Sequence, residues 1–364
     1  MRKYNSYRDA ISALRKKDPE GFRSAEIDVV DRPPANECGV GEVEKRINAL
    51  FLSSLKGIIR EHRQAVDKLA GNMSALQLFN PFRRKSPAIL RRISKPLSDD
   101  TWGTLGIRRL ILDQAFSPVS QDPWFSISGD GHSERGGWPE MKNEALTSDI
   151  EDIFSCCMLI EFADWAGLAD ASGFWDGLYL DVIKRLGKRD FRFIFHLGDV
   201  SKRGVFEIDE AIDIISEYSS YGKVTLILHS QEADSLWNIL NGRSAETSFT
   251  DDGLPTSADG YSFLFDRLTI ETLLILQDDQ VFRLCHAGQE ALAGRTSVGR
   301  REASEIRHQF AVGYQIGALL ELDALYCMAL GHAVVGAYVK TSSGPVSAML
   351  LTYLDEWIND VKAI

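Results

Sequence analysis

The stretch F-R-F-I-F-H-L-G-D-V-S-K-R-G at residues 191–204 decides how this chain is expected to fold. Its apolar residues predict a strand from Phe191 to Leu197. A helical pattern follows at Glu207–Tyr218, and a second strand is expected at Lys223–Leu228. Strand, helix and strand in this order predict parallel strands joined by right-handed crossovers. The stretch therefore predicts an α/β fold, in which ligands collect at the carboxyl ends of the strands.

The alternation continues on both sides of this stretch. Upstream, the apolar run Phe154–Phe162 predicts a strand, and Phe174–Leu186 has the spacing of an amphipathic helix. Downstream, a helix is expected at Ala233–Leu240 and a third, short strand at Val281–Cys285. The apolar residues after Tyr314 are interrupted by acidic residues, and they predict a buried helix followed by a strand rather than a membrane span.

The first 150 residues show no such alternation. We therefore expect an α/β domain at residues 151–364, preceded by a mainly helical and loop-rich extension at residues 1–150. The extension contains a long amphipathic helix at Gly41–Ala70. One face of this helix carries Val43, Ile47, Leu50, Ser54, Ile58, His62, Val66 and Leu69. We expect this face to pack on the domain or on a second copy of the chain, and the alternative is a helix that binds a partner.

A basic arm at residues 79–96, F-N-P-F-R-R-K-S-P-A-I-L-R-R-I-S-K-P, follows that helix. It holds no acidic residue, although the whole chain has a net charge of −11. Its candidate anion-binding residues are Arg83, Arg84, Arg91 and Arg92. We expect an exposed arm that pairs with acidic residues of its own protein. The alternative is an arm that binds a phosphate-rich partner or an anionic membrane surface.

Composition excludes some classes of protein. The acidic balance argues against a chain that binds nucleic acid over its whole surface. The five cysteines form no C-x-x-C and match no zinc module, so we expect reduced thiols and a cytoplasmic protein. Residues 1–18 are charged and lack an apolar core, so they predict no secretory signal.

Short polar motifs stand at the expected ends of the strands and helices. They are G-D-V-S-K-R-G at 198–204, H-S-Q-E at 229–232, H-A-G at 286–288 and G-H-A at 331–333. Their order resembles that of the calcineurin-like metallophosphoesterases of the Ser/Thr-phosphatase and dinucleoside-tetraphosphatase type. The resemblance extends from Phe154 to Trp357 and implies an α/β/β/α sandwich.

The resemblance also implies a metal site. The implied metal ligands are Asp164, in F-A-D-W-A-G, together with Asp199, His286 and His332. Arg203 would bind phosphate. A divalent ion such as Mn, Fe or Zn would activate the attacking water in this family.

The chain departs from the family pattern at four positions: Ala166, Lys202, Ser230 and Gln231 stand where the family has histidine, aspartate, asparagine and the catalytic histidine. Of the G-N-H-E motif only Glu232 remains, and His229 is the candidate replacement for the missing acid. A second candidate for the first motif is G-D-G-H at 129–132, with Asp130 and His132. In the alternative without a metal site, His286 and His332 are buried structural residues and Asp199 caps a turn.

These departures predict a degenerate metallophosphoesterase-like protein. It would bind a phosphorylated small molecule or protein partner, with weak or no hydrolysis, and hold one divalent metal or none. One alternative is an active metal-dependent phosphoric ester hydrolase with a rearranged or single-metal site. Another is an interaction protein that uses the helix at 41–70, with oligomer formation through that helix. The sequence does not decide between enzyme and binding protein, and it identifies no substrate, metal or oligomeric state.

Overall fold

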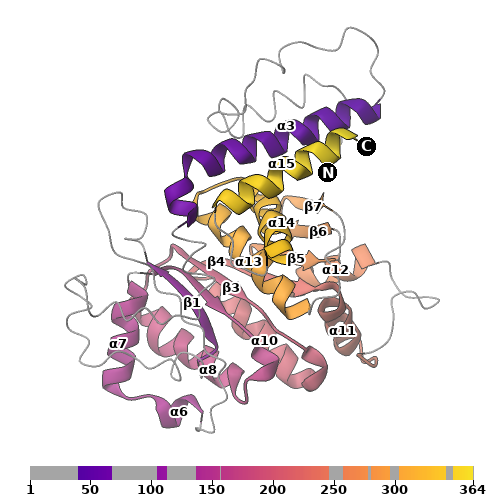
Figure 1. Ribbon diagram of the computed structural model, residues 1–364. Helices are drawn as coiled ribbons and strands as arrows, with labels where there is room; N and C mark the ends of the chain where they lie inside the picture. The colour runs from indigo at the N-terminus through magenta and orange to yellow at the C-terminus, as the bar shows by residue number, and fades with distance from the viewer. Residues whose placement is uncertain are drawn as a thin grey trace. The chain divides into compact units, whose positions relative to one another are not determined.

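The computed structural model describes most of the second half of the chain and parts of the first (Figure 1). The described residues are 40–67, 105–112, 137–155, 157–245, 257–277, 280–295, 303–341 and 347–363. Their contacts divide the chain into two units. The first comprises Met1–Ala75, Gln277–Val281 and Ala291–Ile364, and the second comprises Leu76–Leu276 and Phe282–Glu290. The predicted boundary at residue 150 stays a prediction.

The described strands form one sheet of seven strands in the order β1 to β7. The strands are β1 (Ile107–Leu112), β2 (Cys157–Phe162), β3 (Phe191–Phe195), β4 (Gly222–His229), β5 (Thr272–Leu276), β6 (Gln280–Cys285) and β7 (Gly288–Ala293). Strand β1 pairs with β2 antiparallel, and β2, β3, β4 and β5 pair in parallel. The predicted α/β class and the parallel pairing are therefore confirmed.

The predicted sandwich is wrong. An α/β/β/α sandwich needs two sheets packed face to face, whereas all seven described strands belong to a single sheet. The predicted strand after Leu330 is also wrong, because residues 331–339 lie inside helix α14 (Ala324–Thr341). An unbroken apolar run does not distinguish a buried helix from a buried strand.

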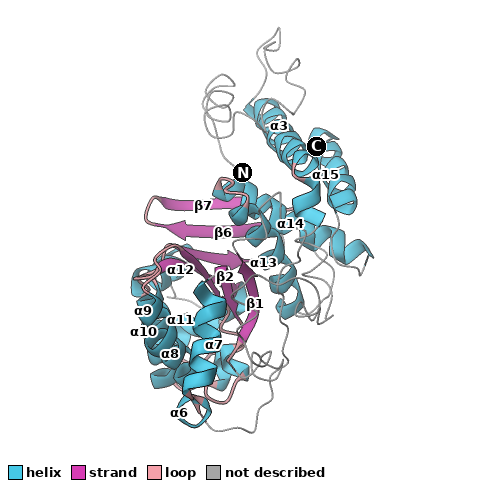
Figure 2. Ribbon diagram, turned by 90° about the vertical axis from the view of Figure 1, so that its left-hand side faces the viewer, coloured by secondary structure: helices cyan, strands magenta, loops and turns pink. Residues whose placement is uncertain are grey.

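Helices alternate with the parallel strands of the second unit. They are α6 (Trp138–Met141), α7 (Glu144–Ser155), α8 (Ala171–Leu178), α9 (Lys184–Leu186), α10 (Val205–Tyr218), α11 (Ser230–Leu240) and α12 (Ser257–Arg267). Short helical turns stand at η4 (Trp165–Gly167) and η6 (Val200–Lys202), and the π-helical η5 (Tyr179–Ile183) joins α8 to α9. Figure 2 shows α8, α9, α10 and α11 gathered on one face of the strands. This face holds the main apolar core.

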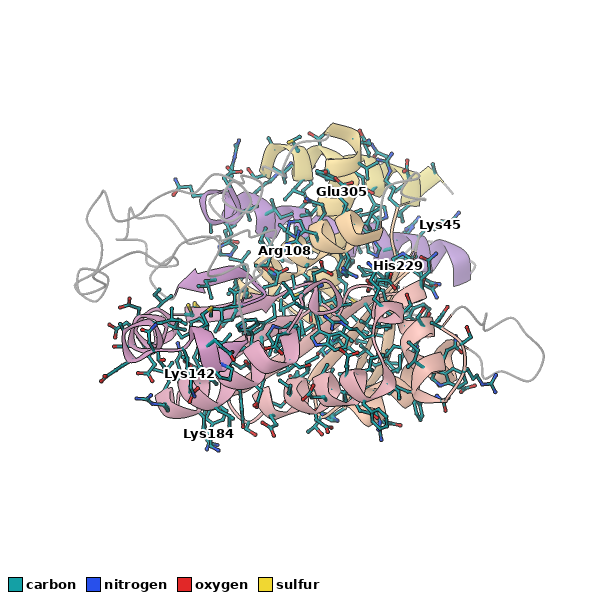
Figure 3. The ribbon with its side chains drawn as sticks, turned by 90° about the horizontal axis from the view of Figure 1, so that it is seen from below. Lys45, Arg108, Lys142, Lys184, His229 and Glu305 are labelled. Atoms are coloured by element: carbon teal, nitrogen blue, oxygen red, sulfur yellow. The ribbon has the colours of Figure 1, made fainter. Side chains whose placement is uncertain are left out.

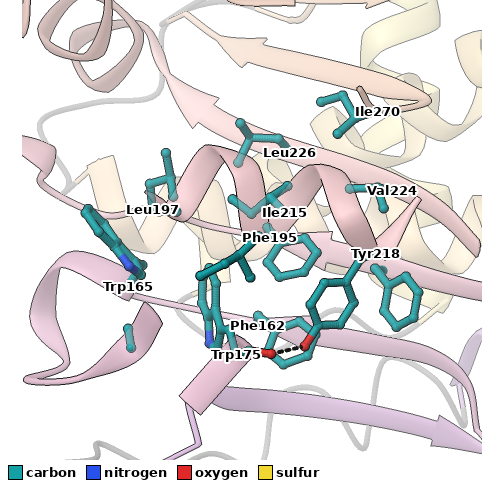
Figure 4. Packing of buried hydrophobic residues seen from close by; sticks show 14 of the residues in the cluster. Phe162, Trp165, Trp175, Phe195, Leu197, Ile215, Tyr218, Val224, Leu226 and Ile270 are labelled. Atoms are coloured by element: carbon teal, nitrogen blue, oxygen red, sulfur yellow. Dashed lines mark hydrogen bonds between the residues drawn. The ribbon is translucent and has the colours of Figure 1, made fainter. Parts of the chain in front are cut away.

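Aromatic rings fill the centre of that core (Figure 4). The ring of Tyr218, at the end of α10, meets Phe193 at 4.9 Å and Phe195 at 5.2 Å, both edge-on. Phe162 stacks on Phe195 at 4.7 Å. The buried Tyr218 hydroxyl donates a hydrogen bond of 2.7 Å to the carbonyl oxygen of Trp175, shown as a dashed line. These contacts fix α8 and α10 on β2 and β3, because each ring packs in one orientation.

Among its described residues, the first unit contains four long helices: α3 (Val40–Glu61), α13 (Ala303–Leu319), α14 and α15 (Ser347–Ala363). Helix α3 packs on α14 and α15. Of the predicted face, Ile47, Ser54 and Ile58 are buried, whereas His62 is exposed. Phe51 stacks on Tyr326 at 4.6 Å, and the Tyr326 hydroxyl bonds to Ser54 at 3.0 Å. Lys56 forms an ion pair with Asp355.

The apolar face of α3 is thus covered by the C-terminal helices of the same chain. The interaction-protein alternative is therefore wrong, because it needs this face to be available to a partner.

Among the described residues, no helix combines the length and apolar character needed to cross a membrane.

We expect Tyr218→Phe to lower the free energy of unfolding by about 1 kcal/mol, because it removes a buried hydrogen bond to the Trp175 carbonyl, which keeps its bond from the Tyr179 amide. Urea denaturation of both proteins measures the difference. Tyr221→Phe is the control, since Tyr221 is only partly buried, and it should change stability by less than about 0.5 kcal/mol. Equal losses for the two variants would contradict the role given to the Tyr218 hydroxyl.

Candidate functional site

The carboxyl ends of β2 and β3 bring two loops together. The register pairs Phe162, the last residue of β2, with Phe195, the last residue of β3. The loops that follow, residues 163–168 and 196–204, are called here the strand-end loops. The amide of Ala166 donates to the carbonyl of Leu197 at 2.8 Å, and the amide of Trp165 donates to the carbonyl of His196 at 3.4 Å. This is the edge of a parallel sheet at which ligands are expected.

Asp164 has an unusual conformation on the first loop. Its φ of 60° lies in the left-handed region, which a residue other than glycine adopts rarely. Its carboxylate lies directly over Gly167 and Gly198, and a Cβ atom at either glycine would overlap a carboxylate oxygen. Gly198 is itself left-handed, with φ of 73°. The glycines therefore leave the space that the exposed Asp164 carboxylate occupies.

Asp199 lies on the second loop. The Ser201 hydroxyl donates to its carboxylate at 2.5 Å and the Ser201 amide donates at 3.2 Å. These bonds, with the nearby Lys202 ammonium, hold the pKa of Asp199 below its ordinary value, so the group is ionised at neutral pH. The side chain is 56% exposed, and it also caps η6. Capping is the role that the sequence offered as an alternative.

Arg203 joins the two loops. Its Nη2 donates to the carbonyl oxygens of Trp165, at 3.4 Å, and of Leu168. Its guanidinium lies 5.3 Å from the centre of the Trp165 ring, and Nη1 donates to Glu207 at 2.9 Å. The side chain is only 16% exposed. Both ends of the guanidinium therefore bind the protein itself, where the resemblance implies a phosphate.

His229 and Glu232 mark the start of α11 at the end of β4. His229, whose side chain is labelled in Figure 3, is the N-cap residue, and its Nδ1 accepts from the amide of Gln231 at 3.4 Å. The Glu232 carboxylate accepts from the amide of His229 at 2.9 Å. These are the two halves of a capping box, so both side chains have a local reason to be there.

The two histidines predicted as metal ligands, His286 and His332, each pack against aromatic rings. His286 is exposed in the turn between β6 and β7, where its ring packs edge-on against Phe265 at 5.4 Å. His332 lies within α14, with its ring edge-on to Phe310 at 5.5 Å and to Trp357 at 6.2 Å. Across the described ranges, no group of three or more His, Cys, Asp or Glu residues could hold a metal. No three of the four predicted ligands therefore form a cluster among the described residues.

Several candidates lie outside the described residues. These are the arginines of the basic arm, Arg83, Arg84, Arg91 and Arg92, and the alternative first motif with Asp130 and His132. Anion binding by the arm stays a prediction.

Asp234 is a feature that the sequence did not reveal. It lies in the second turn of α11, and its Oδ1 is buried without a hydrogen-bond partner among the described residues. Burial raises its pKa from 3.8 to about 6. In the sequence it is one more acid in an amphipathic helix, so only its surroundings show that it is shielded from water.

Comparisons with known proteins give structural likenesses only. No protein-family model matches the sequence, and no curated protein matches it. Adenosine kinase from Sinorhizobium meliloti is 14% identical over 61% of this chain and 59% of its own, with a TM-score of 0.43. Aminoimidazole riboside kinase from Salmonella enterica is 14% identical over 53% and 61%, with a TM-score of 0.38. A carbohydrate kinase from Agrobacterium tumefaciens is 11% identical over 61% and 59%, with a TM-score of 0.38.

The chain thus spans about three fifths of the length of these three proteins. Similarity at this level decides neither the fold nor the activity of the chain.

The resemblance to the metallophosphoesterases is wrong. The described strands form a single sheet, which excludes the sandwich that this family implies. The two predicted functions, a degenerate phosphoesterase and an active one, are therefore both wrong. The roles assigned to Asp199, Arg203 and His286 by that resemblance lose their support with it.

We expect Gly198→Ala to destabilise the protein by about 1–2 kcal/mol, because the new Cβ displaces the Asp164 carboxylate in addition to the strain of a left-handed backbone. Gly187→Ala is the matched control. Gly187 has φ of 64° and nothing within 4 Å of an added Cβ, so it should lose only about 1 kcal/mol. Thermal and urea unfolding measure both. Equal losses would show that the Asp164 carboxylate does not fill the space over Gly198.

We expect Asp234→Asn to stabilise the protein at pH 7 by roughly 1 kcal/mol, less than the full value of such a shift because the side chain is only partly buried. The folded state binds the proton more tightly than the unfolded state, so this carboxyl group lowers stability as pH rises from 3.8 to about 6. The gain should disappear at pH 4. Urea unfolding across pH 4–8 tests this, with the exposed Asp213→Asn as the control. A gain that is the same at all pH values would contradict it.

Proposed function

We propose that the strand-end loops bind a small, uncharged molecule rich in hydroxyl groups, such as a sugar or a nucleoside. The observation that carries this proposal is the left-handed Asp164, whose exposed carboxylate lies over Gly167 and Gly198 at the carboxyl ends of parallel strands. Strained conformations of this kind occur preferentially at binding sites. Two loops fixed to each other can hold such a carboxylate in one place.

The charges on the loops favour this class of ligand. Asp164 and the ionised Asp199 accept hydrogen bonds and donate none, so they suit hydroxyl groups as partners. A phosphorylated ligand would meet two carboxylates. Of the loops' two cationic side chains, Lys202 pairs with Asp199 at 3.6 Å, and Arg203 is already bonded to backbone carbonyls and Glu207. The predicted phosphorylated partner therefore has less support here than a neutral ligand.

The names of the similar solved structures guide the choice of probes. They are kinases for adenosine, for an aminoimidazole riboside and for carbohydrates. Adenosine, ribose and fructose are accordingly the first probes, and ATP with Mg²⁺ is added in a separate arm to test for phosphate transfer.

We expect at least one of these probes to bind in isothermal titration calorimetry, and Asp164→Asn to weaken its binding about tenfold or more, because a charged acceptor becomes an amide. Asp199→Asn should weaken it less, because this group also serves as a cap. The control is Asp209→Asn, a surface residue on α10 that pairs with Arg267 at 2.9 Å.

Binding that Asp164→Asn and Asp209→Asn affect equally would contradict the proposed site. Release of ADP in the ATP arm, lost in Asp164→Asn, would add an activity to the binding function.

A further inference from the structure

We infer that Arg203 is a positioning residue, which fixes Asp164 in its binding conformation. This rests on the proposed ligand site, because it assigns a role within that site. In this role Arg203 does not touch the ligand itself. It acts on the loop that carries Asp164.

The contacts of Arg203 form a strap across the first loop. Its Nη2 meets the carbonyl oxygens of Trp165 and Leu168, which lie one and four residues after Asp164. Its guanidinium also covers the Trp165 ring at 5.3 Å, and that ring is buried. The loop between these two carbonyls is therefore held from one side by a single planar group.

The other end of the strap is anchored on α10. Nη1 of Arg203 donates to Glu207 Oε1 at 2.9 Å, while Glu207 Oε2 accepts from the amide of Gly204 at 2.8 Å. Glu207 is thus bonded on both oxygens within the first turn of the helix. It holds the guanidinium against the loop rather than letting it turn to solvent.

Asp164 needs such a strap because its backbone is unfavourable. A left-handed aspartate gains by rotating to a commoner conformation, and that rotation would carry its carboxylate away from Gly198. The carbonyl contacts on Trp165 and Leu168 oppose it. A lysine at position 203 would keep the charge but not the planar fork, so it would not replace both contacts together with the ring contact.

A double-mutant cycle tests whether Arg203 acts through Asp164. Binding of the probe that the wild-type protein takes is measured for Arg203→Lys, Asp164→Asn and the double variant. We expect Arg203→Lys to weaken binding about tenfold, and the double variant to bind no more weakly than Asp164→Asn alone, because the strap has nothing left to position. Losses that multiply in the double variant would overturn the inference.

A second measurement reads the loop without any ligand. Hydrogen exchange at the amides of residues 164–168 should be at least tenfold faster in Arg203→Lys than in the wild type. The control is Arg267→Lys, which alters a surface ion pair with Asp209 and should leave these amides unchanged. Unchanged exchange in Arg203→Lys would overturn the inference.

The two measurements separate this inference from the proposed function. If no probe binds the wild-type protein, the proposed ligand class fails, and the exchange data still decide whether Arg203 holds the loop. If a probe binds and Arg203→Lys leaves both its affinity and the exchange unchanged, the ligand site stands and the strap does not.

Discussion

The parallel register of β2 and β3 is the constraint on which the candidate site depends. Because Phe162 lies opposite Phe195, both strands end at the same level, and the loops that follow them begin at the same edge of the sheet. The next residues then meet at backbone distance, as the bond from Ala166 to Leu197 shows. A shift of one residue would turn the core-facing rings of β3 outward and separate the two loops. Core packing and site geometry are therefore set by the same hydrogen bonds.

The chain is tightly packed behind the ends of β2 and β3 and turns sharply at those ends. Behind the strand ends, aromatic rings pack around Tyr218 and leave no freedom of register. At the strand ends, the chain must turn sharply, and it does so with left-handed Asp164 and Gly198. Arg203 binds the turns together, because it donates to the carbonyl oxygens of Trp165 and Leu168 on the first loop. Rigid packing behind the loops makes a strained conformation in front of them sustainable.

The same geometry explains why the motifs suggested a different family. In G-D-V-S-K-R-G, the glycine is needed for its positive φ, the aspartate caps η6 and the arginine binds the neighbouring loop. In H-S-Q-E, the histidine and glutamate form a capping box. Each residue type therefore has a local structural use at a strand end or helix start, and a metal site needs the same types. Order and spacing along the chain do not show whether the side chains converge on one point.

The sequence by itself determined the α/β class, the strands β3 and β4 and the long amphipathic helix α3. Apolar periodicity and the order of strands and helices are local properties, and they also predict the edge of the sheet at which ligands bind. The sequence missed β5 and placed a strand inside α14, since short apolar runs fit either structure. Only the tertiary structure decided that His286 and His332 each pack against aromatic rings, that Arg203 is bonded to the first strand-end loop, and that one carboxylate oxygen of Asp234 is buried. These findings depend on which segments distant in the sequence come into contact, and on how exposed each side chain then is to solvent. Neither property follows from the type of residue at a position.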